Sequence, residues 1–250
     1  MTWTWYDGSI VVLGAFAIYI VGSVMIAVVA IPMEGRTPGF WLIPVSYLAL
    51  TFGTFFMVQV WLILHRGGTW RMVGFRVPRA KSVWVGISWM AGLAACAYVL
   101  TLVGSAIIVG LFDLTPFHIK SNVKELLPKH QQTVSATQFV VLIILVSVVA
   151  PLTEETLFRG ALYQGLARDI GHWLGKPAGI GISVVLTGIT FGLFHLLGGA
   201  GELYTLPLLA FLGMVLCLTF QFSGSLGGSM MLHGTVNLIS VVVFYGAHLR

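Results

Sequence analysis

Residues 138–160 read Gln138-Phe-Val-Val-Leu-Ile-Ile-Leu-Val-Ser-Val-Val-Ala-Pro-Leu-Thr-Glu154-Glu155-Thr-Leu-Phe-Arg159-Gly160. The first part of this stretch is long and apolar enough to lie in the hydrocarbon core of a bilayer. An ionised carboxylate at that depth is costly, so acidic residues there are rare and usually have a function. Glu154 and Glu155 are therefore a candidate functional site. The other six acids lie in stretches that we expect to be loops or helix ends: Asp7, Glu34, Asp113, Glu125, Asp169 and Glu202.

The composition of the whole chain is that of a polytopic membrane protein. Hydrophobic residues make up 58% of the 250 residues, charged residues make up 8%, and the mean hydropathy is +0.97. Soluble domains carry about 25% charged residues. The length allows about seven spans of ~20–25 residues with short loops. We therefore predict an all-α fold, a polytopic transmembrane helical bundle of about seven spans (roughly six to eight), forming a single membrane-embedded domain over 1–250.

Apolar runs give the expected positions of the spans. They lie at about 10–31, 40–64, 83–112, 138–166, 178–197, 207–222 and 229–248. The densest basic cluster follows the second run and consists of Arg66, Arg71, Arg76, Arg79 and Lys81. Basic loops tend to stay in the cytoplasm. We therefore expect the N-terminus there as well, in a multi-pass protein of the cell (inner) membrane.

The net charge of +5 does not indicate a nucleic-acid partner. Its basic residues are explained by cytoplasmic loops. The chain has no basic domain and no base-stacking module, which are the features of nucleic-acid-binding proteins. The expected partners are membrane lipid and a substrate or ligand that reaches the buried acids.

Helical spacing separates the roles of the two glutamates. Glu155 and Arg159 are four positions apart, so they share a helix face and can pair. Glu154 points ~100° away, with no cation nearby in the sequence. We expect Glu155 and Arg159 to form a structural pair and Glu154 to be a free carboxylate that can act as a general base on water. The alternative is a purely structural pair, with Glu154 reaching toward the membrane interface.

Three further polar residues lie in later apolar runs. His195 ends the sequence Thr190-Phe-Gly-Leu-Phe-His195, and His233 and Asn237 are four positions apart in His233-Gly-Thr-Val-Asn237. Each of them alone could simply hydrogen-bond a neighbouring helix. Together with Glu154 they place one carboxylate, two imidazoles and one amide on three helices. Such a set can activate a water molecule and stabilise an oxyanion, or bind one metal ion.

The same residues resemble the motifs of the CAAX protease and bacteriocin-processing family, also called the Abi family. Glu154-Glu155-Thr-Leu-Phe-Arg159 resembles its first motif, Glu-Glu-x-x-x-Arg. Residues 191–195 match the second motif, Phe-x-x-x-His, and residues 233–237 match the third, His-x-x-x-Asn or Asp. Three motifs in this order within apolar helices are specific, and they make 138–248 the motif-bearing core. The N-terminal half adds only compatible hydropathy.

The resemblance implies an α-helical intramembrane endopeptidase similar to the CAAX prenyl protease 2 type. By motif position, Glu154 would activate water and His195 would assist it. His233 and Asn237 would stabilise the tetrahedral oxyanion. The glutamate–arginine pair of the first motif would hold that motif in place.

The metal requirement stays open at this point, because members of this family are often called metalloproteases. The chain has no His-Glu-x-x-His helix, which is the usual arrangement in zinc peptidases. Water activated by a glutamate and a histidine needs no metal, so we favour a mechanism without a cofactor. The alternative is a zinc ion bound by the four motif residues Glu154, His195, His233 and Asn237.

The predicted spans raise one geometric problem. If 138–166 runs from outside to inside, Glu154 lies ~24 Å along it, near the cytoplasmic side. His233, early in the last run, is expected on that side too. His195 comes late in a run directed outward, so it is expected near the opposite face. A displaced or re-entrant span, or a different number of spans, would remove the conflict.

Two other classes of function compete with a peptidase. A proton- or cation-coupled transporter would use the same buried acid and histidines as an ion path, although the chain lacks the internal repeats common in transporters. A non-catalytic immunity or scaffold protein would not need all three motifs. We favour a peptidase that acts near the membrane surface on a peptide or protein, lipidated or not. Both a C-terminal C-a-a-X peptide and a peptide precursor fit this expectation.

Overall fold

The computed structural model describes residues 3–34, 42–77, 83–111, 135–197 and 203–245. These residues are 93% helical and include no strand. Seven of their helices are long and apolar enough to cross a membrane: Trp5–Ile26, Pro44–His65, Val83–Leu111, Ala136–Leu174, Lys176–Leu196, Leu206–Ser223 and Leu226–Val243. The predicted all-α polytopic bundle of about seven spans is therefore confirmed.

Several α-helices continue directly into π-helical segments without a break in the chain of helical turns. The N-terminal half contains α1 (Trp5–Glu34), α2 (Leu42–Met57), the π-helix η1 (Val58–His65), α3 (Trp70–Val73) and α4 (Val83–Leu111). The C-terminal half contains α5 (Ala136–Ile144), η3 (Leu145–Val149), α6 (Ala150–Glu155), η4 (Thr156–Tyr163), α7 (Gln164–Leu174), α8 (Lys176–Leu197), η5 (Leu203–Thr205), α9 (Leu206–Ser223) and α10 (Leu226–Tyr245).

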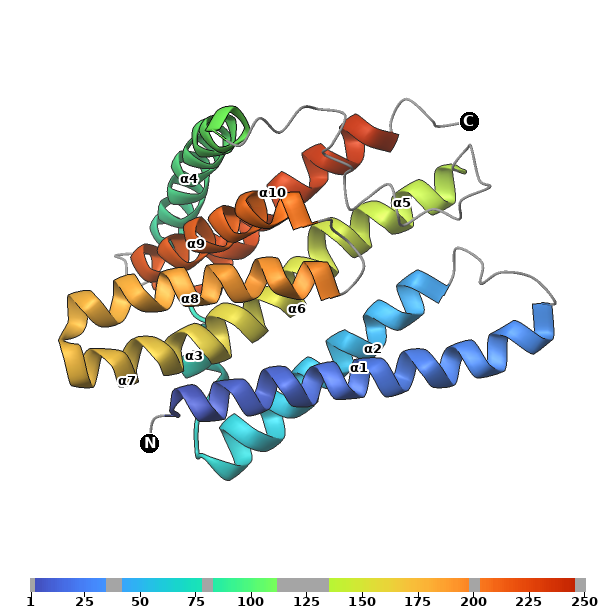
Figure 1. Ribbon diagram of the computed structural model, residues 1–250, viewed down its shortest axis with the longest axis horizontal. Coiled ribbons are helices and arrows are strands. Elements are labelled where there is room, and N and C mark those ends of the chain that lie inside the picture. The colour runs from blue at the N-terminus through green and yellow to red at the C-terminus, as the bar shows by residue number, and fades with distance from the viewer. Residues whose placement is uncertain (1–2, 35–41, 78–82, 112–134, 198–202, 246–250) are drawn as a thin grey trace.

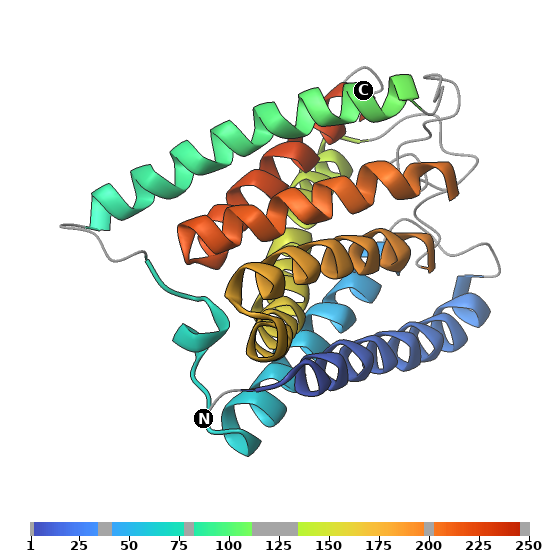
Figure 2. The ribbon, with the colours of Figure 1, turned by 60° about the vertical axis from the view of Figure 1, so that its left-hand side comes forward.

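The helices that carry the motifs lie in the middle of the bundle (Figure 1). On one side, α1 packs along α2 and also contacts η4 and α7. On the other side, α4 lies across α9 and α10, as Figure 2 shows. Between these outer layers, α8 contacts both α7 and α9, and α10 contacts η3 and α6. Helices from both halves of the chain therefore surround the two glutamates.

The longest helical run extends from Ala136 to Leu174 and contains 39 residues. At about 1.5 Å per residue it is ~58 Å long, which exceeds the ~30 Å thickness of a hydrocarbon core. The apolar pattern predicted an end at 166, but the helix continues because α7 is amphipathic and packs against α1 and α8. Its polar residues end the apolar run without ending the helix. Gly175, with a φ of 86°, stops it.

Wide turns lie on both sides of the short helix α6. Pro151 has no N–H, so it cannot bond to the carbonyl of Ser147 four residues earlier. The backbone forms the π-helix η3 just before Pro151 and the π-helix η4 just after the two glutamates. A Cβ atom added to Gly234 of α10 would lie 2.5 Å from the Ser147 carbonyl oxygen. The backbones of α10 and η3 therefore meet beside the neighbouring His233.

Two further acids lie within the ranges of candidate spans: Asp7, at a helix end as expected, and Asp169, which lies inside α7. Asp7, in the first turn of α1, is buried and accepts hydrogen bonds from Arg66 Nη2 at 2.7 Å and Trp61 Nε1 at 3.0 Å. Asp169, in α7, accepts from the backbone N–H of Trp5 at 2.8 Å. Glu154 and Glu155 are thus not the only acids within the spans, because the helices extend beyond the apolar runs. The expectations for Asp113, Glu125 and Glu202 lie outside the described residues.

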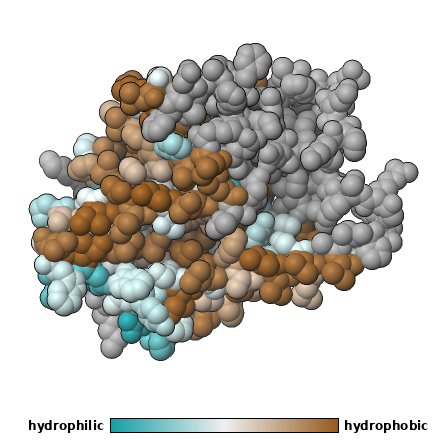
Figure 3. Space-filling view, viewed as in Figure 1, coloured by the Kyte–Doolittle hydropathy of each residue, from teal (hydrophilic) through white to brown (hydrophobic). Residues whose placement is uncertain are grey.

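Hydrophobic side chains cover the flanks of the helices, and Figure 3 shows hydrophilic ones gathered toward the end where α7 meets α8. Large apolar side chains such as Trp84, Leu111 and Trp173 are exposed, as expected where lipid replaces water. The chain is thus an integral multi-pass membrane protein. Arg79 and Lys81 of the basic cluster lie outside the described residues. The cytoplasmic N-terminus and the inner membrane stay predictions.

Candidate functional site

Glu154 and Glu155 end α6 in the interior of the bundle, where both side chains are buried. The surrounding groups come from three other helices. Figure 1 shows α6 between α2 and α8, with α10 packed against it. The two carboxylates point to different neighbours, as their ~100° rotation about the helix axis requires.

Glu155 forms the ion pair that helical spacing predicts. Its Oε1 lies 2.9 Å from Arg159 Nη1, and both side chains are fully buried. Arg159 Nη2 also donates to the carbonyl oxygen of Gly213 in α9 at 2.7 Å. The guanidinium carbon lies 4.8 Å from the centre of the Phe191 ring of α8, within cation–π range. Two of the guanidinium N–H groups are thus paired, and the buried Nε has no hydrogen-bond partner among the described residues.

His233 is oriented by the same carboxylate. Its Nδ1 lies 2.9 Å from Glu155 Oε1. Because Glu155 is paired with Arg159, its oxygen accepts and His233 Nδ1 carries the hydrogen. The other ring nitrogen, Nε2, faces Glu154 Oε2 at 3.8 Å. Sequence spacing does not reveal this second role of Glu155, because the two residues lie on different helices.

His195 is oriented by its own helix. Its Nδ1 lies 2.8 Å from the carbonyl oxygen of Phe191, one turn earlier in α8. A carbonyl can only accept, so Nδ1 again carries the hydrogen. The Nε2 atom of His195 faces Glu154 Oε2 at 3.6 Å. The motif spacing of four residues therefore fixes the tautomer of this ring.

The expected separation of His195 from Glu154 is wrong. The turn at Gly175 divides the α7–α8 hairpin, and Glu154 precedes it by about as many residues as His195 follows it. In an antiparallel pair of helices, positions at equal distance from the turn lie side by side. The conflict arose because the predicted span ended at 166, which misplaced the turn. With the helix continuing to Leu174, no displaced or re-entrant span is needed.

The two oxygens of Glu154 have different surroundings. Its Oε1 accepts a hydrogen bond from the phenol of Tyr47 in α2. Its Oε2 lies between the Nε2 atoms of His195 and His233 and has no hydrogen-bond partner among the described residues. Two imidazole nitrogens with lone pairs thus lie 3.6 and 3.8 Å from this carboxylate oxygen. A water molecule there would have acceptors for both of its hydrogens.

Tyr47 is the site residue that sequence reasoning missed. The family match agrees that the N-terminal half adds only compatible hydropathy to the resemblance, but α2 of that half supplies this direct contact to Glu154. One signal was available in the sequence. Tyr47 and Thr51 are polar, four positions apart and inside an apolar run, which marks one face of α2 for a polar contact.

Asn237 lies one turn beyond His233 on α10, but the structure gives it a different partner. Its Nδ2 donates to the carbonyl oxygen of Val146 in η3 at 2.8 Å. A π-helical turn leaves a carbonyl without its usual helical partner, and Asn237 occupies one carbonyl of that segment. No hydrogen bond found among the described residues joins Asn237 to Glu154, His195 or His233. Its amide retains a second N–H.

The side chains around Glu154 are of types that bind metal ions, but they are not grouped as closely as the ligands of a metal site. Glu154 Oε2 and the two imidazole Nε2 atoms are ligand types that zinc accepts. In the described part of the chain, no three His, Cys, Asp or Glu side chains are grouped closely enough to form a metal site. If an ion binds, Glu154, His195 and His233 would hold it, and Asn237 would join them through Oδ1, because its bond to Val146 uses Nδ2.

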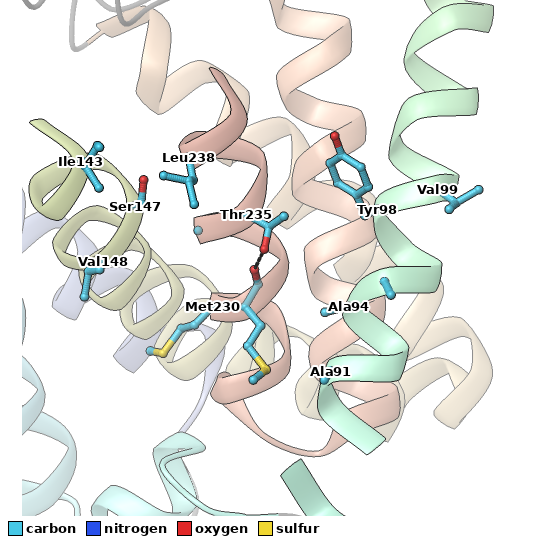
Figure 4. Close-up of a pocket in the computed structure, with 13 residues that line it drawn as sticks. Ala91, Ala94, Tyr98, Val99, Ile143, Ser147, Val148, Met230, Thr235 and Leu238 are labelled. Carbon is cyan, nitrogen blue, oxygen red and sulfur yellow. Dashed lines mark hydrogen bonds between the residues drawn. The ribbon is translucent and has the colours of Figure 1, made fainter. Parts of the chain in front are cut away.

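An apolar cavity of about 720 Å³ lies between α4, α5 with η3, and α10. Figure 4 shows Ala91 and Ala94 on one wall, Val148 on another and Thr235 between them. None of the seven motif residues lines it. This cavity is therefore separate from the cluster around Glu154.

Comparison with known proteins supports the interpretation of the motifs. Residues 136–239 match the family described as Rce1-like, type II CAAX prenyl endopeptidase. This range includes all seven motif residues, and the resemblance drawn from them is confirmed over it. An uncharacterized protein of Mycoplasma capricolum subsp. capricolum is 31% identical over 105 residues, which cover 42% of this chain and 27% of that protein. The chain thus matches about a quarter of that relative's length. No solved structure matches the chain.

Proposed function

We propose, from the match of residues 136–239 to the type II CAAX prenyl endopeptidases, that this chain is an intramembrane endopeptidase. One observation supports the proposal most directly. Glu154 Oε2 faces the Nε2 atoms of His195 and His233 at 3.6 and 3.8 Å, inside a bundle of membrane-spanning helices. A buried carboxylate between two oriented imidazoles is suited to activating a water molecule.

The first step is attack by water on the scissile carbonyl carbon. Glu154 Oε2 takes a proton from the water as the new C–O bond forms, and the carbonyl electron pair moves onto oxygen. His195 Nε2 accepts the other hydrogen of the water and so orients it. The ring of His195 is held by the neutral carbonyl of Phe191, which suits a neutral orienting role.

The resulting oxyanion needs hydrogen-bond donors. His233 Nε2 provides one by taking up the proton that Glu154 received from the water, because the carboxylate of Glu155 behind the ring stabilises the developing imidazolium. This proton returns to Glu154 before the C–N bond breaks. The second N–H of the Asn237 amide is the other donor of the proposal. In the second step the C–N bond breaks, and the leaving nitrogen takes the proton from Glu154. No metal is required by these steps, and Glu154, His195 and His233 would bind zinc in the alternative.

The substrate of the proposal is a peptide or protein that enters the membrane. The His195 side chain is 17% exposed, whereas those of Glu154 and His233 are 3% exposed. We therefore expect the scissile bond to approach from the His195 side. A C-terminal C-a-a-X peptide with an isoprenoid chain and an unmodified peptide precursor are the two substrate classes to compare.

The test is cleavage of a mixed peptide library by purified protein in proteoliposomes. The library contains C-a-a-X peptides with and without a prenyl group, together with unmodified precursor peptides. The wild type is expected to cleave one class, and Glu154→Gln is expected to cleave none while remaining folded. Equal cleavage by the two proteins would remove Glu154 as the base. If neither folded protein cleaves any peptide, proton flux across the same proteoliposomes tests the transporter alternative.

A further inference from the structure

We infer that Tyr47 is a positioning residue for this reaction, holding one oxygen of Glu154 so that the other faces both imidazoles. The inference rests on the proposed function. Tyr47 belongs to α2, which precedes the matched range 136–239, and none of the three motifs includes it. The proposed active site would then be incomplete without the N-terminal half of the chain.

The contact is a hydrogen bond from the Tyr47 phenol to Glu154 Oε1. An ionised carboxylate can only accept hydrogen bonds. The two imidazoles cannot supply one while their Nε2 atoms carry lone pairs, since their hydrogens are on Nδ1. Tyr47 is therefore the side chain around Glu154, within the described residues, that donates in the resting site. Removing its hydroxyl would leave Oε1 buried without a donor, which is an unfavourable state.

The hydrogen bond also sets the plane of the carboxylate. The terminal torsion of a glutamate is broad, so a free carboxylate turns easily. With Oε1 held by Tyr47, Oε2 lies at nearly equal distances from the two Nε2 atoms, 3.6 and 3.8 Å. Water bound at this point can contact all three groups at once. Small changes in such placement have large effects on the rate of a reaction step.

A neighbouring contact offers a matched control. Thr51 lies one turn after Tyr47 on α2, and its Oγ1 is 2.9 Å from Oγ1 of Thr153. This bond joins α2 to α6 beside Glu154 without contacting its carboxylate. Thr51→Val removes a hydroxyl from the same helix face and the same helix–helix contact. It also removes the bond from Thr51 Oγ1 to the carbonyl oxygen of Tyr47 but keeps the Tyr47 phenol, so it separates the packing of α2 on α6 from the contact of that phenol with Glu154.

The experiment compares wild type, Tyr47→Phe, Thr51→Val and Glu154→Gln on one cleaved peptide in proteoliposomes. Tyr47→Phe is expected to lower kcat about 10–100-fold, the usual effect of losing a group that orients an active-site residue. KM is expected to stay unchanged, because Tyr47 does not contact the peptide. Thr51→Val is expected to keep the wild-type kcat. The melting temperature and monodispersity of each purified variant measure folding separately.

Four results would overturn the assignment of Tyr47. These are a wild-type kcat in Tyr47→Phe, a change in KM alone, an equal fall in kcat in Thr51→Val, and a fall in rate that matches a loss of folded protein. If the wild type cleaves and Glu154→Gln does not, the proposed function stands, and these four results then contradict only the role of Tyr47. If Glu154→Gln cleaves as fast as the wild type, or neither cleaves, the proposed function fails together with the inference.

Discussion

His233 and Glu155 share a buried hydrogen bond, with Nδ1 at 2.9 Å from Oε1. The same carboxylate oxygen lies 2.9 Å from Nη1 of Arg159. One oxygen thus connects an imidazole of the proposed active site to a guanidinium held by α9. The second glutamate of the motif orients a ring in addition to anchoring the arginine.

Glu155→Gln is expected to reduce both stability and activity. The amide oxygen can still accept from His233, but the charge that balances the buried Arg159 is lost. Breaking a buried ion pair from one side costs about 3–5 kcal/mol. Thermal unfolding of the purified protein in detergent measures the first effect, and peptide cleavage measures the second. Wild-type stability would show that Arg159 is compensated by other groups.

Arg159→Met tests the pair from the other side. Alone it leaves the Glu155 carboxylate buried without its cation, so a loss of about 3–5 kcal/mol is again expected. The double variant with Glu155→Gln removes both charges and should be less destabilised than the sum of the single variants. Additive losses in this double-mutant cycle would contradict a direct coupling of the two side chains.

Gly234→Ala is expected to move α10 away from η3. The new methyl group would lie 2.5 Å from the Ser147 carbonyl oxygen, closer than atoms can approach. Forcing an extra methyl group into a packed contact costs about 1–3 kcal/mol. Because His233 adjoins Gly234, the displacement should also lower the rate of cleavage. Unfolding and cleavage assays on the same sample measure both.

The matched control for this variant is Gly181→Ala on α8. A Cβ atom at Gly181 would meet no other atom within 4 Å. Alanine in a helix is about 0.5–1 kcal/mol more favourable than glycine, so this variant should be at least as stable as the wild type. A similar loss of activity in both variants would refute a specific role for the contact between Gly234 and Ser147.

Treatment with a chelator separates the two mechanisms of water activation. We expect cleavage to continue after dialysis against a strong zinc chelator, because Glu154 and the histidines suffice in the proposed steps. Elemental analysis of the purified protein gives a second readout. Loss of activity that zinc restores, together with less bound zinc in His195→Ala and His233→Ala, would establish the metal-dependent alternative.

The spans and the helix-local contacts could be predicted from the sequence. Apolar runs locate membrane helices because the thickness of the bilayer core sets the length of a span and its low polarity sets the composition. The contact between Glu155 and Arg159 follows from a spacing of four within one helix. Such features depend only on neighbouring residues, so a single sequence is sufficient for them.

The remaining contacts depend on how helices pack, which no local pattern encodes. Tyr47 and Glu154 are separated by 107 positions, and only the packing of α2 on α6 brings them together. The depth of His195 was misjudged because polarity, not helix length, set the predicted end at 166. The burial of Asp7 depends in the same way on Trp61 of η1 and on Arg66 just after it.

The long run from Ala136 to Leu174 also limits what can reach Glu154. At about 1.5 Å per residue, Glu154 lies ~27 Å from the first residue of this run and ~30 Å from the last. A fully extended peptide covers at most ~3.3–3.6 Å per residue. On the proposed function, a chain coming from the level of either helix end needs about eight unfolded residues before its scissile bond meets the water. A tightly folded protein whose unfolded tails are shorter than about eight residues would not be cleaved, whatever its sequence.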